Sequence, residues 1–394
     1  MSRSFRLPLA FKTHLAEGFP ALAKLDALKE VQGTKEQLLK HHAEAFTIRR
    51  LEVTCDQEYK KRLIRGFLHL YDGQEAIAVG AETALTREDD WITTYRCHGV
   101  ALVRGHTPKA VFAELLGKAE GASRGKGGSM HLYRGPEAHF WGGAAIVGSH
   151  VPAGAGFALA IKYKSEDPKK MKTCALAAYG DGAANQGQVW EAANMAMLWR
   201  LPFIMMIENN QYGMGTSVQR SSALTSYYKQ GGVIIPGVQV NGMDSLAMHH
   251  AVRACKEHVT AGNGPVFLEA VTYRLHGHSM SDPGLSYRTR EEVEKVRAER
   301  DPVELIKQRV VEAGFATADE LKERERKIRD DVNQALADAH AAKLPPASEA
   351  YTDVYTTGRA VEPGDGHKRW ESEFPGFVRG VERLRGRKGD AVVG

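Results

Sequence analysis

The sequence is poor in cysteine and has no long hydrophobic run, and both shortages narrow the possibilities. Only four of its 394 residues are cysteines, and they lie far apart without a Cys-x-x-Cys pair. This spacing argues against a disulfide framework and a zinc site, and it favours a reducing compartment. No apolar stretch is long enough to span a membrane. With 43% apolar residues, the chain is expected to be globular, with one large core or two moderate ones.

A large excess of charge of one sign is also missing. The chain has 53 basic and 48 acidic residues, a formal net charge of +5. This balance gives no case for nucleic-acid binding, although acidic cofactors or partners fit it. Residues 1–16 differ, because they contain Arg3, Arg6 and Lys12 and no acidic residue. That pattern is compatible with a mitochondrial presequence or its remnant, and equally with an irregular or surface-bound N-terminus.

Strand-like and helix-like segments alternate along most of the chain. Helical spacing of apolar residues predicts a long helix over residues 34–61, and Asp72 followed by Glu75 predicts the capped start of another. Short apolar runs predict strands at 91–96, 174–178, 203–207, 237–240 and 265–274. The alternation predicts an α/β fold with a mainly parallel sheet and helices on both faces.

The chain changes character towards its C-terminus. Residues 289–300, 302–313 and 317–342 predict three charged amphipathic helices, whereas the residues after 345 are rich in glycine, proline and arginine. We therefore divide the chain into three parts. They are an N-terminal extension at 1–33, which is a candidate targeting remnant, an α/β domain with its C-terminal helices at 34–345, and a tail at 346–394.

The most informative stretch contains two half-motifs, each at the end of a predicted strand. Gly180-Asp181-Gly182 follows one strand, and Asn209-Asn210 follows the next. Because the carboxyl ends of parallel strands lie at one edge of a sheet, Asp181 and Asn210 are expected to meet. Their oxygens, with a backbone carbonyl just beyond Asn210, suit Mg²⁺. Either half alone is better explained as a turn or a strand cap, but the pair predicts a magnesium-bound diphosphate.

Two other glycine-rich motifs are incomplete. Asn185 stands where the third glycine of a dinucleotide-binding motif belongs. Residues 125–129 have the composition of a phosphate-binding loop without its spacing. They belong to a glycine-dominated stretch at 121–143, which we predict to be a long irregular loop. His131 and His139 lie in this stretch, and no role is assigned to them.

Further candidates lie in other segments of the chain. Arg96 suits a diphosphate through bidentate hydrogen bonds, although a surface ion pair explains it equally well without the neighbouring motif. Val147 lies where its backbone can contact a flat cofactor ring. The polar loop after residue 274 contains His276 and His278, which are candidates for proton transfer or members of a surface loop. His69 precedes a helix, and its position alone favours an ordinary loop histidine.

Taken in order, these segments resemble the α subunit of the pyruvate dehydrogenase E1 component. The likeness covers roughly residues 34–355 and is carried by the segments 69–75, 95–99, 125–131, 180–188, 208–217 and 276–290. It implies a thiamine-diphosphate-binding fold in the domain at 34–345, with thiamine diphosphate and Mg²⁺ as cofactors. The implied reaction is oxidative decarboxylation of pyruvate, with transfer of the acetyl unit to the lipoyl group of E2.

The resemblance also implies roles for single residues. Mg²⁺ would be bound by Asp181, Asn210 and the carbonyl oxygen of Tyr212. The substrate would be contacted by His69 and His278, which would also transfer protons. His278 would contact the cofactor as well. The remaining cofactor contacts would be Tyr95 and Arg96 at the diphosphate, Val147 at the aminopyrimidine, and the backbone of Gly182 and Ala183. A regulatory kinase phosphorylates family members at positions that match Ser217, Ser279 and Ser286, and a phosphatase removes these phosphates.

The implied partners are an E1 β subunit in an α2β2 heterotetramer and the lipoyl domain of E2, in the mitochondrial matrix. Neither nucleic acid nor a membrane span is expected. Two alternatives stay open: a branched-chain 2-oxoacid dehydrogenase α subunit, which fits less well at several segments, and a non-catalytic regulatory paralogue. The chain also departs from the family pattern, because Ala144-Ala145 replaces a usual Asn-Gly, and the loop at 134–141 is a few residues longer.

Overall fold

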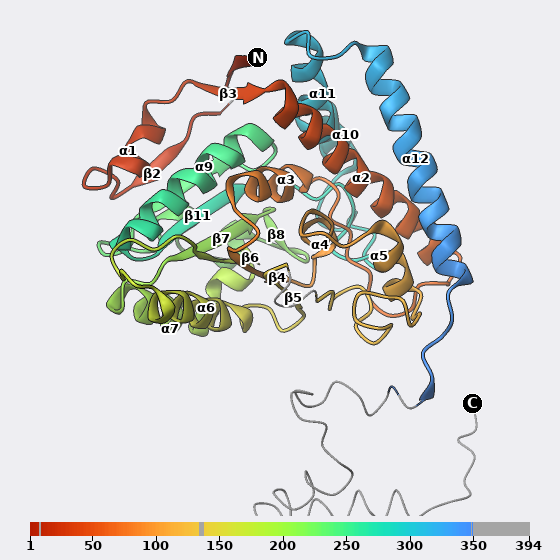
Figure 1. Ribbon diagram of the computed structural model, residues 1–394, viewed down its shortest axis with the longest axis horizontal. Helices are drawn as coiled ribbons and strands as arrows, with labels where there is room; N and C mark the ends of the chain where they lie inside the picture. The colour runs from red at the N-terminus through yellow and green to blue at the C-terminus, as the bar shows by residue number, and fades with distance from the viewer. Residues whose placement is uncertain (8, 134–137, 348, 350–394) are drawn as a thin grey trace, which may run out of the picture. The chain divides into compact units, whose positions relative to one another are not determined.

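The computed structural model describes residues 1–7, 9–133, 138–347 and 349. A seven-stranded sheet with the order β2-β10-β11-β7-β6-β4-β5 lies at its centre (Figure 1). Every neighbouring pair in this sheet is parallel except β2 with β10. Its strands are β2 (Lys12–His14), β4 (Asp90–Thr94), β5 (Phe140–Ala144), β6 (Ala175–Gly180), β7 (Phe203–Asn209), β10 (Gly237–Asn241) and β11 (Val266–Val271). The predicted mainly parallel α/β fold is confirmed.

Helices cover both faces of this sheet, as Figure 1 shows. On one face lie α2 (Lys35–Lys60), α3 (Glu75–Ala84), α4 (His98–Val103), α5 (Pro108–Leu115) and α9 (Ser245–His258), and on the other lie α6 (His150–Lys164) and α7 (Gly187–Leu198). All seven residues of β7 are buried, as expected for a parallel strand covered on both sides. This explains why β7 appears in the sequence as a continuous apolar run.

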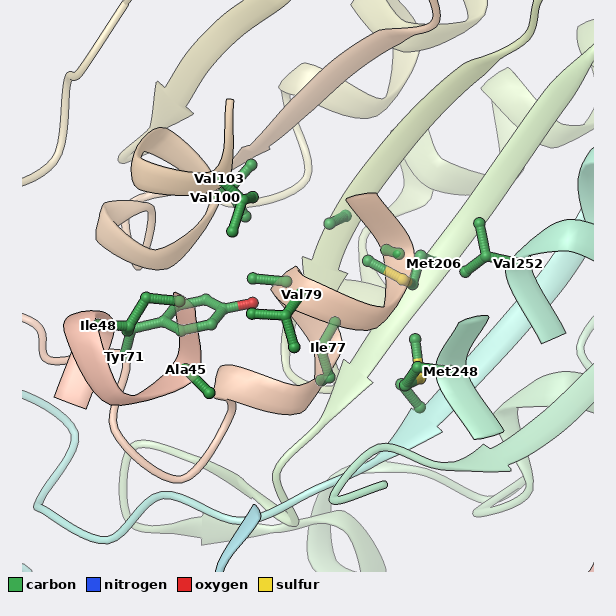
Figure 2. Packing of buried hydrophobic residues seen from close by; sticks show 14 of the residues in the cluster. Ala45, Ile48, Tyr71, Ile77, Val79, Val100, Val103, Met206, Met248 and Val252 are labelled. Atoms are coloured by element: carbon green, nitrogen blue, oxygen red, sulfur yellow. The ribbon is translucent and has the colours of Figure 1, made fainter. Parts of the chain in front are cut away.

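Two hydrophobic clusters fill the space between the sheet and its helices. The larger cluster lies under α2, α3 and α9, and Figure 2 shows Val79, Met206 and Met248 among its members. Gly80 lets α3 approach α9 closely, because a Cβ there would lie 2.5 Å from the Ser245 carbonyl oxygen. The smaller cluster, under α6 and α7, is rich in alanine and contains larger side chains from β6 and β7.

Two parts of the chain differ from what its sequence predicts. Residues 140–144 form β5 at the sheet edge instead of continuing an irregular loop, because β4 supplies backbone partners for them. The first residues form β1 (Ser2–Arg6), which pairs with β3 (Glu30–Thr34), while β2 extends the central sheet. Phe5, Leu7 and Phe11 are buried, so this segment consists of packed strands.

The three C-terminal helices are confirmed as α10 (Arg290–Arg300), α11 (Pro302–Glu312) and α12 (Ala318–Ala341). Each begins after a side-chain N-cap, Thr289, Asp301 or Thr317. Arg309 donates two hydrogen bonds to Asp244, which ties α11 to the start of α9. None of the described helices is both long and apolar enough to cross a bilayer. Of the predicted tail, only residues 346, 347 and 349 are described.

Shorter elements of the described part of the chain include α1 (Pro20–Asp26), β8 (Tyr212–Gly213), β9 (Thr216–Ser217) and α8 (Val218–Ser221). The strands β8 and β9 pair antiparallel just beyond the end of β7, with Tyr212 opposite Ser217. This small hairpin therefore lies next to the carboxyl edge of the sheet, where the two half-motifs also end.

Candidate functional site

Asp181 and Asn210 meet at the carboxyl edge of the sheet, directly after β6 and β7. The backbone N–H of Asn210 donates to Asp181 Oδ1 at 3.2 Å. Asp181 is 1% exposed, and its Oδ2 has no hydrogen-bond partner. The Oδ1 of Asn210 is also buried without a partner. Two neighbouring acceptor oxygens without donors fit a bound cation, since buried acceptors are otherwise nearly always satisfied.

The surroundings of Asp181 also favour a cation. Burial raises the pKa of this carboxyl to about 6, because the charged form loses its hydration. Within the described residues, no group of three or more histidine, cysteine or acidic side chains could hold a metal ion. An ion at Asp181 therefore needs amide, carbonyl and ligand oxygens to complete its coordination, which suits Mg²⁺ bound to a phosphate compound.

The backbone around the motif turn completes this end of the site. Gly182 and Ala183 lie between β6 and α7, where Ala183 begins a short 3₁₀ turn. A Cβ on Gly182 would lie 3.3 Å from the Cα of Gly213, so the turn and the β8–β9 hairpin are in close contact. The hairpin thus brings Tyr212, whose carbonyl is the third predicted ligand, next to the motif.

Two residues that received no predicted role fix the orientation of Asn210. Gln74 Oε1 accepts a hydrogen bond from Asn210 Nδ2 at 3.1 Å, and its Nε2 donates to Glu208 Oε2 at 3.3 Å. The hydroxyl of Tyr71 donates to Glu208 Oε1 at 3.1 Å. Burial raises the pKa of Glu208 to about 7. Because Gln74 holds the amide nitrogen of Asn210, the position of this side chain is fixed and its Oδ1 stays available to a cation.

A second group of side chains brings three predicted residues together. The ring of His69 lies 4.3 Å from that of Tyr95 and 5.5 Å from that of His278, between centroids. His69 lies between α2 and α3, Tyr95 follows β4 and His278 follows β11, so two strand-end loops and one helix-connecting loop converge here. Burial, with the charge of Arg96, lowers the pKa of His69 to about 2 and that of His278 to about 3. Both imidazoles are therefore neutral at physiological pH.

The tautomer of His278 follows from its neighbours. Arg274 Nη1 lies 2.8 Å from His278 Nδ1, and a guanidinium can only donate, so Nδ1 is the acceptor. In the neutral ring the proton is then on Nε2, which lies 3.3 Å from the Tyr95 hydroxyl oxygen. His278 accordingly presents an N–H donor to the space it shares with Tyr95 and His69.

Arg96 links the two loops that carry these histidines. It is 3% exposed, and its Nη1 donates to the Leu70 carbonyl oxygen at 2.5 Å while Nη2 donates to the His278 carbonyl oxygen at 2.8 Å. Each of these nitrogens keeps a second N–H for a ligand. Arg274 is also buried, and burial together with Arg96 lowers its pKa to about 10. Two adjacent buried guanidinium groups favour an anion in the site.

Asp72 does not cap α3 as its sequence position predicts. The N-cap position is Gln74, without a side-chain hydrogen bond, and Glu75 Oε2 accepts from the Gly73 N–H instead. The carboxylate of Asp72 faces His276 Nδ1 at 2.6 Å, which draws it away from the helix. This hydrogen bond raises the pKa of His276. His276 is thereby turned from the ring cluster of His69, Tyr95 and His278 towards Asp72.

The other predicted residues lie around this site. Val147 is half-buried against the smaller cluster, and a Cβ on the next residue, Gly148, would lie 3.0 Å from Gln186 of the motif turn. Ser279 is buried and its Oγ contacts Ser281 Oγ at 2.9 Å, whereas Ser286 is exposed. Ser217 is half-buried in β9. Ala144 and Ala145, which replace the usual Asn-Gly of the family, lie where the chain passes from β5 into the turn before Val147.

Comparison with known proteins shows the family to which this chain is similar. The family described as "Dehydrogenase E1 component" matches residues 43–348. The chain belongs to the dehydrogenase E1 component family. This family depends on thiamine diphosphate. The resemblance recognised from the sequence segments is thus confirmed.

Several members of the E1 family are similar to this chain over most of its length. It is 50% identical to the pyruvate dehydrogenase E1 component subunit alpha-1, mitochondrial, of Oryza sativa subsp. japonica, over 85% of this chain and 84% of the relative. It is 49% identical to the pyruvate dehydrogenase E1 component subunit alpha, somatic form, mitochondrial, of Homo sapiens, over 84% of this chain and 82% of the relative. It is 49% identical to the pyruvate dehydrogenase E1 component subunit alpha, mitochondrial, of Schizosaccharomyces pombe, over 88% of this chain and 82% of the relative.

Proposed function

We propose that this chain is the α subunit of a mitochondrial pyruvate dehydrogenase E1 component. It takes part in the oxidative decarboxylation of pyruvate and in transfer of the acetyl unit to the lipoyl group of an E2 partner. The observation that carries this proposal is the pair of unpartnered buried oxygens, Asp181 Oδ2 and Asn210 Oδ1, at the sheet edge. The names of relatives that are about half identical over most of the chain support the choice of substrate.

The residues at the sheet edge would hold thiamine diphosphate through Mg²⁺. Asp181, Asn210 and the Tyr212 carbonyl are the proposed metal ligands, and the backbone of Gly182 and Ala183 accommodates the diphosphate. Tyr95 and Arg96 add contacts at the diphosphate, and Val147 contacts the aminopyrimidine. When bound, thiamine diphosphate supplies a thiazolium that accepts the electrons released as carbon dioxide leaves.

The two histidines act on the substrate side. His278 carries its proton on Nε2 and can donate a hydrogen bond to a developing negative charge on the substrate oxygen. His69 has a buried Nδ1 without a partner, which can accept or deliver a proton in the same space. Because Arg96 ties the His278 backbone to that of Leu70, both rings are kept in one arrangement.

The proposed assembly and regulation follow from family membership. The chain pairs with an E1 β subunit in an α2β2 heterotetramer and meets the E2 lipoyl domain, in the mitochondrial matrix. A regulatory kinase and phosphatase act at Ser217, Ser279 and Ser286. A phosphate on Ser279 adds about two negative charges beside His278 and opposes binding of an anionic substrate. Ser279 is 6% exposed, so its loop has to open before a kinase can reach it.

The experiment that tests this function is substrate profiling of the purified α/β pair. With thiamine diphosphate, Mg²⁺ and an artificial electron acceptor, pyruvate should be turned over and branched-chain 2-oxoacids should react far more slowly. A preference for branched-chain substrates would replace the proposed substrate. Binding of the cofactor without turnover of either class would identify a regulatory paralogue. Full activity from the α chain alone would contradict the proposal that the α2β2 heterotetramer is the active form.

A further inference from the structure

A buried carboxylate outside the proposed site organises the glycine-rich loop. Glu114 lies on α5 and is 1% exposed. Its Oε2 accepts hydrogen bonds from the backbone N–H groups of Ser123 at 2.7 Å and Gly125 at 2.9 Å. Its Oε1 accepts from the N–H groups of Gly127 at 2.6 Å and Gly128 at 3.2 Å. Four backbone donors thus replace the water that this carboxylate loses on burial.

The glycines of this loop are fitted to that carboxylate. Gly125 and Gly128 have φ angles of +77° and +60°, a region that favours glycine. A Cβ on Gly121 would lie 2.3 Å from Glu114 Oε2, and one on Gly127 would lie 2.1 Å from a backbone carbonyl oxygen. Successive N–H groups of this kind form a concave anion site. The stretch that resembles a phosphate-binding loop in composition therefore encloses a carboxylate of its own chain.

The next residue of the loop reaches the candidate active site. Ser129 is 4% exposed, and its Oγ accepts from the backbone N–H of His69 at 3.4 Å. His98 Nε2 lies 3.0 Å from the same Oγ, and its Nδ1 faces both oxygens of Glu52 at 3.0 Å. Glu52 in turn accepts from the Tyr71 N–H at 2.9 Å. The loop is therefore connected to the backbone on both sides of residue 70.

We propose that Glu114 is a positioning residue for the reaction: its carboxylate holds the loop 123–128 in place, and the loop sets the position of His69 through Ser129. Glu114 itself lies on α5 beneath the loop and acts only through it. The inference rests on the proposed function, because it concerns the part that His69 plays in turnover. It assigns the glycine-rich stretch to alignment of the reacting end and not to phosphate binding.

The variant that tests this is Glu114→Gln in the assembled α/β enzyme. Glutamine keeps the shape but replaces one oxygen by an NH₂ group, so two of the four backbone donors lose their acceptor. Amide hydrogen exchange should accelerate at residues 123–131 and also at 68–71. The kcat for pyruvate should fall about 10–100-fold, as for other outer-shell partners, with thiamine diphosphate affinity changed less than about threefold. Glu120→Gln is the matched control, because Glu120 is exposed and paired with Lys109 in the same region.

A second variant tests the connection itself. Ser129→Ala removes the hydroxyl between the loop and His69, so it should lower kcat and accelerate exchange at 68–71 while exchange at 123–128 stays near wild type. The double variant should lose less than the product of the two single losses, because both changes break one pathway. Faster exchange at 123–131 with unchanged kcat and unchanged exchange at 68–71 would overturn the proposal. So would a Ser129→Ala enzyme of normal kcat, whether or not Glu114→Gln assembles.

The exchange measurement separates this inference from the proposed function. If the wild-type assembly does not turn over pyruvate, the proposed function fails, but exchange at 68–71 still decides the role of Glu114. Equal exchange at 68–71 in wild type and Glu114→Gln refutes it, and faster exchange in the variant supports it.

Discussion

Replacing Asp181 by asparagine should change the ligand-free and the ligand-bound protein in opposite directions. The carboxyl group is 1% exposed, and burial raises its pKa from 3.8 to about 6. A difference of about two pKa units corresponds to about 3 kcal/mol of destabilisation from the charged carboxylate at pH 7. Asparagine is neutral and keeps the oxygen that accepts from the Asn210 N–H. The ligand-free variant should therefore be more stable than wild type, by up to about 3 kcal/mol at pH 7.

This gain in the free energy of unfolding should depend on pH. The folded-state pKa of Asp181 lies above its unfolded value of 3.8, so the folded chain binds the proton more tightly. Wild type consequently loses stability from this group as pH rises from about 4 to about 6, whereas the variant does not. The difference in the free energy of unfolding between the variant and wild type should be small near the lower end of that pH range and should reach its full value above the range.

Thiamine diphosphate and Mg²⁺ should reverse the order. A ligand at 1,000 times its Kd stabilises the folded state by about 4.1 kcal/mol, which exceeds the gain in the ligand-free variant, and loss of the Asp181 carboxylate removes much of this stabilisation. The assay is unfolding of the α/β assembly at pH 5 and pH 7.5, with and without both ligands. Asp331→Asn is the control, since Asp331 is exposed and paired with Lys327 at the surface. A ligand-free Asp181→Asn protein less stable than wild type at pH 7.5 would refute the reasoning.

Four further results are expected. His278→Asn should lower kcat by about 10²–10⁴-fold with little change in Mg²⁺ affinity, and normal turnover would exclude the proposed donor role. In NMR titrations, the pKa of His276 should lie above its usual value of 6.5 because of its hydrogen bond to Asp72. Asp72→Asn should lower this pKa, and an unchanged pKa would show that the hydrogen bond does not raise it. Ser279→Glu should slow pyruvate turnover through added negative charge, so a normal rate contradicts the phosphorylation proposal. Gln74→Ala should weaken Mg²⁺ binding about 10–100-fold, measured by titration of the assembly, and unaltered binding would remove Gln74 from the metal site.

Most of the fold could be predicted because the burial of its elements is simple. Strands covered on both faces, such as β7, appear as continuous apolar runs, and amphipathic helices such as α11 alternate with the period of a helix. β5 could not be predicted in this way. Its apolar run stops after Phe140 and Trp141, because Gly142 and Gly143 follow, and it is a strand because β4 offers it an open edge. Likewise β1 becomes visible only through its pairing with β3.

The candidate site was predictable where one rule of parallel sheets applies. The strand-end rule brings Asp181 and Asn210 together, and the structure places them in hydrogen-bond contact. The same rule could not find Gln74 and Glu208, because their contacts cross between a helix start and a strand. Such side-chain contacts between distant segments leave no spacing in the sequence. The wrong prediction for Asp72 has the same origin, since its partner, His276, lies on another loop.

The two ends of the site have opposite electrostatic needs, because one end lacks a cation and the other lacks anions. At one end Asp181 Oδ2 and Asn210 Oδ1 are acceptors without donors. At the other end Arg96 and Arg274 are 3% and 2% exposed, and Arg274 Nε is a buried donor without an acceptor. Arg274 is close enough to oppose the rise in the pKa of Asp181, so the two ends are electrostatically coupled. A magnesium-bound diphosphate together with an anionic substrate supplies the cation that one end lacks and the anions that the other lacks. Binding at either end should therefore strengthen binding at the other.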